Sequence, residues 1–118
     1  MTLQPTKTQL EDAACAGGVK YMTGDECAGI WALPRDKKTE SGYHWQPHLP
    51  TTQGKADLLD LMIAAGIEYV VGYNCLTASS EHQSLKTVQI VDGNKHAALA
   101  QAVIEVAAQI GAKMKGGV

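Results

Sequence analysis

The most regular pattern of hydrophobic positions lies near the C-terminus of the chain. Leu99, Val103, Val106 and Ile110 follow one another at steps of four, three and four residues, which is the spacing of one face of an α-helix. Asn94 precedes this pattern and can cap the N-terminus of the helix. The many alanines between the larger side chains let such a helix approach a sheet or another helix closely. We therefore predict a long helix that begins after Asn94.

Ile104 lies off the main apolar stripe of this helix. An exposed isoleucine there would indicate a contact between subunits, whereas a wide apolar stripe would bury it. We favour the wide stripe.

Two earlier segments also have the helical period. The longer one runs through KADLLDLMIAA, with Leu58, Leu61, Met62 and Ala65 on one face, and the shorter one is rich in alanine. Each has capping residues before it and glycine after it, as helices commonly do. For the short alanine-rich helix, the candidate N-caps are Thr6 or Thr8 and the terminating residues are Gly17 and Gly18. For the helix through KADLLDLMIAA, the candidate N-caps are Thr51 or Thr52 and the terminating residue is Gly66.

Four runs of strand-forming residues lie between these helices. The predicted strands are 28–33, 43–46, 67–74 and 87–91. A charged tract after Pro34 separates the first two strands, which favours an antiparallel hairpin with a long loop. The tract 75–86 is polar and rich in turn formers, so we predict a loop there. The resulting order αββαββα predicts an α+β fold, a small layered sandwich in which helices pack on an antiparallel or mixed four-stranded sheet.

Composition limits the classes of function. With 118 residues and 45% hydrophobic content, the chain 1–118 has the size of a single domain with its own core. A net charge of −2 gives no broad cationic surface, so we expect no binding to a nucleic acid polymer. Three widely spaced cysteines without a CxxC pair favour reduced thiols. Because the N-terminus does not read as a signal peptide and no apolar run reaches membrane length, we expect no membrane partner and an intracellular location.

Residues that could carry metal or acyl-transfer chemistry are present but poorly arranged. His44 and His48 have zinc-like spacing, but Pro47 lies between them in a segment that reads as extended. Cys75 and His82 can form a thiolate and base pair, yet no orienting third group stands at a recognisable spacing. We favour ordinary surface histidines and a buried thiol, and predict no metal, no cofactor, no catalytic residue and no enzyme activity.

The start of the C-terminal helix is a first candidate binding site. A strand ends in Asp92-Gly93, and the helix begins with Asn94, Lys95 and His96. Free backbone N–H groups at a helix N-terminus attract phosphate or carboxylate, and Lys95 and His96 can assist. An ordinary capped helix is the simpler interpretation.

The predicted hairpin is the second candidate site. Aromatic rings that stack on a base, beside cations that meet phosphate, are the elements of a nucleotide pocket. The alternative is that the indoles belong to the core and the charges to a solvated loop. The candidate ligand-binding residues of this hairpin and its flank are Trp31, Arg35, Lys38, Tyr43, Trp45 and His48.

Trp45-x-Pro47, followed by TTQGKADLLDLMIAAGIEYVV and later by AALAQAVIEVAAQIGAKM, resembles the phage ABA-sandwich family of small tailed-phage and prophage proteins. The resemblance covers most of residues 43–114. It implies a layered fold and a viral origin, with Trp45 and Pro47 forming a corner whose indole packs on the core. The family has no agreed biochemical role, so no catalytic residue is carried over.

Three classes of function are consistent with the sequence. The leading hypothesis is a phage anti-defence protein that acts in the cytoplasm of the infected bacterial host. It would bind and sequester a small anionic nucleotide-like immune signal, of the cyclic ADP-ribose type or related, as a homo-oligomer and without cleaving it. The second is an interaction module that inhibits or adapts a host or phage protein through an exposed face. The third is a small nucleotide-processing hydrolase.

Overall fold

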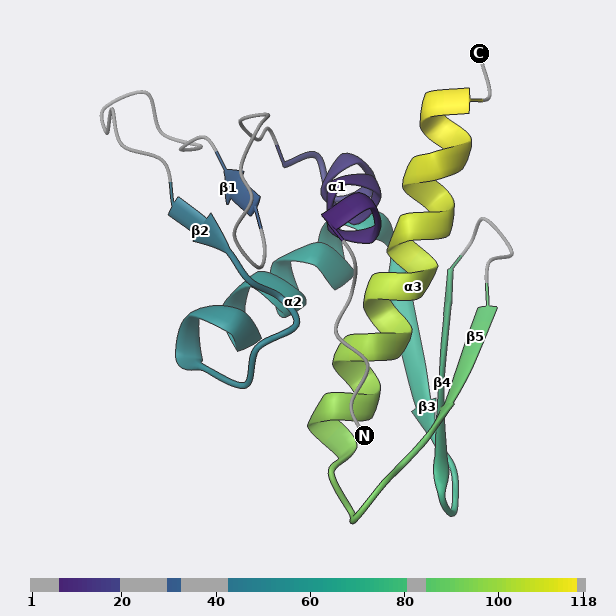
Figure 1. The fold of residues 1–118 in the computed structure, drawn as a ribbon. Coiled ribbons are helices and arrows are strands. Elements are labelled where there is room, and N and C mark those ends of the chain that lie inside the picture. The colour runs from purple at the N-terminus through teal and green to yellow at the C-terminus, as the bar shows by residue number, and fades with distance from the viewer. Residues whose placement is uncertain (1–6, 20–29, 33–42, 81–84, 117–118) are drawn as a thin grey trace.

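The computed structural model describes residues 7–19, 30–32, 43–80 and 85–116 of the chain. Within them three helices and five strands follow one another, which confirms the α+β class (Figure 1). The elements are α1 (Lys7–Ala16), β1 (Ile30–Ala32), β2 (Tyr43–Trp45), α2 (Thr52–Ala65), β3 (Ile67–Val71), β4 (Cys75–Ser80), β5 (Leu85–Gln89) and α3 (Lys95–Gly116).

The three predicted helices are confirmed, as are both ends of α2 and the start of α3, whereas the predicted cap Thr6 lies outside the described residues and Thr8 lies inside α1. The Thr51 hydroxyl accepts a hydrogen bond from the Gly54 N–H at 3.0 Å and caps α2. Gly66 ends the helix in the left-handed conformation, with φ of 67°, which glycine adopts at little cost. At α3, the Asn94 side-chain oxygen accepts from the Ala97 N–H at 3.1 Å. The capping residues Thr51 and Asn94 therefore determine where α2 and α3 begin.

The sheet arrangement differs from the prediction of one four-stranded sheet. β1 and β2 form a separate two-stranded antiparallel hairpin, while β3, β4 and β5 form a three-stranded antiparallel sheet in that order. The additional strand is β4, in the tract that we expected to be a loop. In β4 the buried residues Leu76 and Ala78 alternate with the half-buried Thr77 and Ser79, which is the period of two of a strand. The polar composition of the tract hides this alternation in the sequence. The observed order is αββαβββα.

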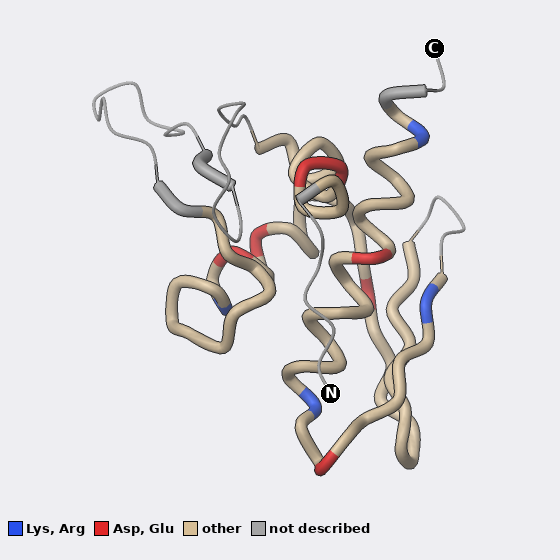
Figure 2. Tube along the Cα trace, viewed as in Figure 1, with Lys and Arg blue, Asp and Glu red and all other residues tan. Residues whose placement is uncertain are grey.

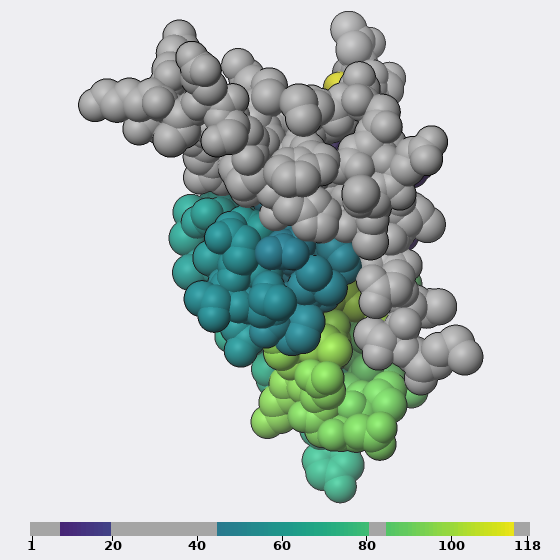
Figure 3. Space-filling view, turned by 60° about the vertical axis from the view of Figure 1, so that its left-hand side comes forward, coloured from purple at the N-terminus to yellow at the C-terminus, as the bar shows by residue number. Residues whose placement is uncertain are grey.

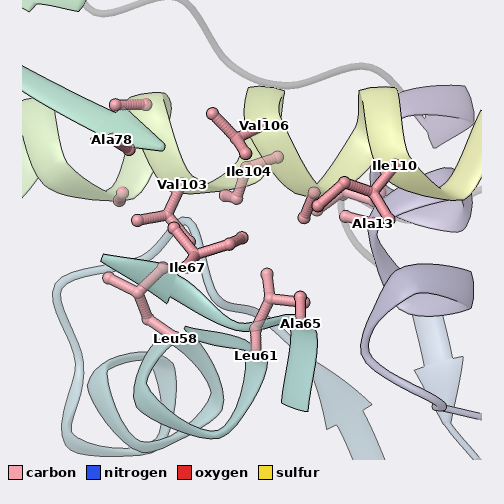
Figure 4. Packing of buried hydrophobic residues seen from close by; sticks show 14 of the residues in the cluster. Ala13, Leu58, Leu61, Ala65, Ile67, Ala78, Val103, Ile104, Val106 and Ile110 are labelled. Atoms are coloured by element: carbon pink, nitrogen blue, oxygen red, sulfur yellow. The ribbon is translucent and has the colours of Figure 1, made fainter. Parts of the chain in front are cut away.

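Helix α3 is the centre of the hydrophobic core. Val103 and Ile104 contribute to it, and the side chains of Leu58, Leu61 and Ile67 point toward α3 from α2 and β3 (Figure 4). Ile104 is only 1% exposed, so the wide apolar stripe is confirmed.

Helix α1 crosses α3 through small residues. Ala13 and Ala14 are fully buried on α1, and Figure 4 shows Ala13 beside Ile110 of α3. At the crossing, a Cβ atom on Gly111 would overlap the backbone carbonyl of Asp12. The two backbones therefore approach more closely than any larger residue allows.

The three-stranded sheet is covered by α3 on one face. On that face Ile67, Tyr69 and Val71 of β3 lie in rows with residues of β4 that include the buried Leu76 and Ala78. Side chains of the opposite face are exposed or half-buried in every strand, and Thr77 and Thr87 join their hydroxyls across it at 2.9 Å. The described residues thus place a helical layer on one side of the sheet only.

Candidate functional site

Strand β3 forms one edge of the three-stranded sheet. The Gly72 N–H donates to the Cys75 carbonyl at 2.7 Å across the hairpin that joins β3 to β4. Because hydrogen-bonded and non-hydrogen-bonded pairs alternate in an antiparallel ladder, Val70 and Glu68 also face β4 with their backbone groups. The N–H and C=O groups of Tyr69 and Val71 consequently point away from the sheet, toward its open edge.

The side chains along this edge are apolar on both faces of the strand. Tyr69 is 47% exposed, Val70 70% and Val71 43%, and Tyr73 at the hairpin tip is fully exposed. Glu68 is the only charged residue of β3. Natural sheets commonly protect an edge with lysine, proline or a bulge, and β3 has none of these in its five residues. Among the described residues these outward backbone groups have no hydrogen-bond partner, so the edge combines unpaired backbone groups with an exposed apolar surface.

The sequence contains a signal for this edge that our interpretation did not use. Strict alternation predicts one buried and one solvated face for a strand, whereas Tyr69, Val70 and Val71 are three consecutive apolar residues. Such a run is typical of a strand buried on both sides. Residues 69–71 are instead exposed on both faces of β3, so the composition of this segment is that of a strand with neighbours, although the described residues place a neighbour on one side only.

A small cavity lies where β5 leads into α3. Its volume is about 160 Å³, below the roughly 300–1,000 Å³ of pockets that hold drug-sized ligands. Asp92 is the one charged side chain in its described lining, which opposes binding of an anion. The lining residues are Gln89, Val91, Asp92, Asn94, Ala97, Ala98 and Gln101.

The predicted anion site at the start of α3 shares only Asn94 with this cavity. Backbone donors there already have acceptors: the Lys95 N–H donates to the Gly93 carbonyl at 3.0 Å, and Ala97 donates to the Asn94 side chain. The described contacts therefore match an ordinary capped helix, in which these two N–H groups are not available to a phosphate.

The candidate residues of the hairpin are only partly described. Trp45 is 1% exposed within the hydrophobic core, which corrects its assignment as a ligand-stacking residue and confirms the expected packing of the corner. β1 and β2 pair Trp31 with His44 and Ala32 with Tyr43, while the side chains of Trp31 and Tyr43 are not described. Arg35 and Lys38 lie outside the described residues, and His48 is half-buried in the turn after β2.

The described cations do not gather into one patch. Lysines stand singly on α2, on β5 and at the two ends of α3 (Figure 2). One of them, Lys86, lies 3.8 Å from a carboxylate oxygen of Glu105. At this distance and exposure the pair contributes little. The described surface therefore offers no concentrated positive charge to a nucleotide.

His96 is the described residue whose protonation is most clearly altered by the fold. Burial lowers its pKa below the ordinary 6.5, and the positive charge of Lys55 on α2 lowers it further. Its Nε2 atom is buried and accepts no hydrogen bond from the described residues. Figure 3 shows α2 packed against the first half of α3, which agrees with the effect of the Lys55 charge on the pKa of His96.

We expect the His96 environment to make stability depend on pH. Its lowered pKa means that the unfolded chain binds the proton more tightly than the folded chain, so stability is fully present above about pH 6.5 and is lost as the pH falls from there through the lowered pKa. Urea unfolding of wild type and His96→Gln between about pH 7.5 and pH 5.5 measures this effect. Wild type should lose more stability than the variant over this range. Equal slopes would mean that His96 titrates normally.

The described part of the chain contains neither a cluster of metal-ligating side chains nor a helix that could span a membrane. Its His, Cys, Asp and Glu side chains form no group of three that could hold a metal ion. Cys15 and Cys75 are free thiols. In the described ranges, every helix is too short or too polar to cross a bilayer.

Comparison with known proteins gives no match: no family model, no curated protein and no solved structure is significantly similar to this chain. The resemblance to the phage ABA-sandwich family therefore stays a prediction.

Proposed function

We propose that this protein is a non-enzymatic interaction module that binds another polypeptide by adding a strand to the open edge of β3. The observation that carries the proposal is the coincidence of outward-facing backbone groups and exposed apolar side chains at Tyr69, Val70 and Val71. Main-chain hydrogen bonds give affinity in this mode of recognition, and alternate side chains give specificity.

The free energy of strand addition favours the β3 edge over the other exposed apolar residues. Single hydrophobic residues on a surface are normal, and Leu59 and Ile63 on α2 are exposed without any unpaired backbone beside them. At β3, an added strand satisfies the backbone groups of Tyr69 and Val71 and covers three apolar side chains at once.

Sequestration of a nucleotide-like signal stays a prediction. Arg35 and Lys38, and the side chains of Trp31 and Tyr43, lie outside what the structure describes, and Trp45 is buried. The phage origin, the anti-defence role and the location in the host cytoplasm depend on the resemblance and are predictions as well.

A selection from a display library of extended peptides tests the proposal, with wild-type protein as bait and Val71→Lys as counter-bait. We expect extended peptides with apolar residues on both faces to bind wild type and to bind Val71→Lys at least tenfold more weakly, because a charge at the edge blocks strand addition.

Ile63→Lys is the matched control, since it places the same charge at an apolar α2 residue that is 72% exposed. This variant should retain peptide binding. A library that yields no peptide sensitive to Val71→Lys, or peptides equally sensitive to Ile63→Lys, would remove the β3 edge as the binding surface.

A further inference from the structure

We infer that a second copy of this chain occupies the β3 edge, antiparallel to the first and related to it by a two-fold axis at Val70. The inference rests on the proposed function of β3 as a strand-pairing edge and names its partner. It joins two three-stranded sheets into one continuous six-stranded sheet.

Backbone geometry selects this register. Tyr69 and Val71 both direct their N–H and C=O groups outward, and an axis at Val70 places Tyr69 of one copy opposite Val71 of the other. Each such pair exchanges two hydrogen bonds, so the two symmetric pairs supply roughly four. The backbone N–H and C=O groups of Ile67 also point outward, but this residue is only 6% exposed. The accessible part of the strand therefore lies at residues 68–72, centred on Val70.

The side chains complement one another in the same register. On the outer face the two Val70 side chains meet at the axis, and these are the most exposed apolar residues of β3. On the helix face Tyr69 packs beside Val71 of the second copy, an aromatic and β-branched pair of the kind that stabilises sheets. A partner strand must be apolar on both faces to match this edge, and β3 itself has that composition.

Charge placement is consistent with self-pairing. Glu68 lies opposite Gly72 of the second copy, two positions from the axis, so the two carboxylates do not face each other. The net charge of −2 per chain adds little repulsion at moderate ionic strength.

Two short strands cover less area than the roughly 1,600 Å² of a standard interface. We therefore expect a weak dimer whose population rises with concentration. Sedimentation equilibrium of the full chain from about 10 µM to about 1 mM spans the range of dissociation constants that such an interface gives.

Substitutions at the axis make the test specific to this register. Val70→Lys brings two positive charges together at the axis and should raise the dissociation constant at least tenfold. Leu59→Lys, at an α2 residue that is 57% exposed, should leave it unchanged.

Cross-linking reports the position of the axis directly. In Val70→Cys the two introduced thiols lie at a non-hydrogen-bonded pair with Cα atoms about 4.5 Å apart, within the range of a disulfide. In Glu68→Cys the corresponding atoms lie about 14 Å apart, beyond that range. Mild oxidation followed by peptide mass mapping should give a symmetric link in the first variant and none in the second, and mapping separates these links from those of the native cysteines.

The outcomes separate this inference from the proposed function. Concentration-dependent dimers that Val70→Lys weakens and Val70→Cys locks would support it. A monomer up to about 1 mM, a dimer insensitive to Val70→Lys, or equal cross-linking at positions 68 and 70 would overturn it. In each of those cases the peptide selection still decides whether the edge binds another polypeptide.

Discussion

Replacing Gly111 with alanine is expected to lower the free energy of unfolding by about 2–3 kcal/mol. Intrinsic helix propensity acts in the opposite direction, because alanine in a helix interior is favoured over glycine by about 0.5–1 kcal/mol. Steric overlap outweighs that gain, since the new Cβ would coincide with the Asp12 carbonyl of α1 and would also lie 3.1 Å from the Asp12 Cα. Both are backbone atoms, which move only if the α1–α3 crossing opens.

Urea unfolding measures this effect, and Ala112→Leu is its control. Ala112 is exposed beside Gly111 on α3, so added bulk there points to solvent and should change stability by less than about 0.5 kcal/mol. A Gly111→Ala protein as stable as wild type, or more stable, would mean that the helices cross at a greater distance than described.

The helices could be predicted from the sequence because their determinants are local. Thr51, Gly66 and Asn94 are the caps and stops that the structure contains, and each acts within one turn of its own position. Apolar spacing likewise identified the buried face of α3, including the wide stripe that buries Ile104.

The sheet was harder to predict because its determinants are nonlocal. Strand β4 is defined by pairing on both sides, and its buried Ala78 carries no strand preference of its own. β3 also shows the limit of reasoning from composition, because a run such as Tyr69–Val71 is equally consistent with a central strand and an open edge. Which of the two it becomes depends on whether another strand pairs with its second side.

The predicted ligand residues show a similar limit. Trp45 was both a candidate stacking ring and a candidate core residue, and its burial assigns it to the core. At the start of α3, the Asn94 side chain and the Lys95 N–H form hydrogen bonds within their own turn and are not available to a ligand. Aromatic and basic residues near one another in sequence therefore define a pocket only when the fold leaves both exposed.

The second large effect is expected from Asp57→Ala. Asp57 is 4% exposed on α2, and its carboxylate holds the chain corner that follows β2. One oxygen accepts the Gln46 N–H at 3.0 Å, and the other accepts the Gln53 side-chain amide at 2.8 Å. Hydrogen bonds to charged groups contribute about 1.5–3 kcal/mol each, and removal of the acceptor leaves a part-buried backbone donor unsatisfied.

We expect the free energy of unfolding to fall by about 3 kcal/mol in Asp57→Ala and by roughly half as much in Asp57→Asn, which keeps one acceptor oxygen. Glu68→Gln neutralises an exposed carboxylate on β3 and should cost less than about 0.5 kcal/mol. A double-mutant cycle with Gln53→Ala isolates the side-chain bond from the backbone bond.

Equal losses in Asp57→Ala and Glu68→Gln would refute the anchoring role of Asp57. The corner matters beyond its own hydrogen bonds, because it also seats Trp45 in the core and brings the chain so close to α2 that a Cβ on Gly54 would lie 2.8 Å from the Gln46 carbonyl oxygen. Release of the corner should therefore expose Trp45. A red shift of tryptophan fluorescence in Asp57→Ala before global unfolding, measured in a Trp31→Phe background that leaves Trp45 as the one indole, would report that exposure directly.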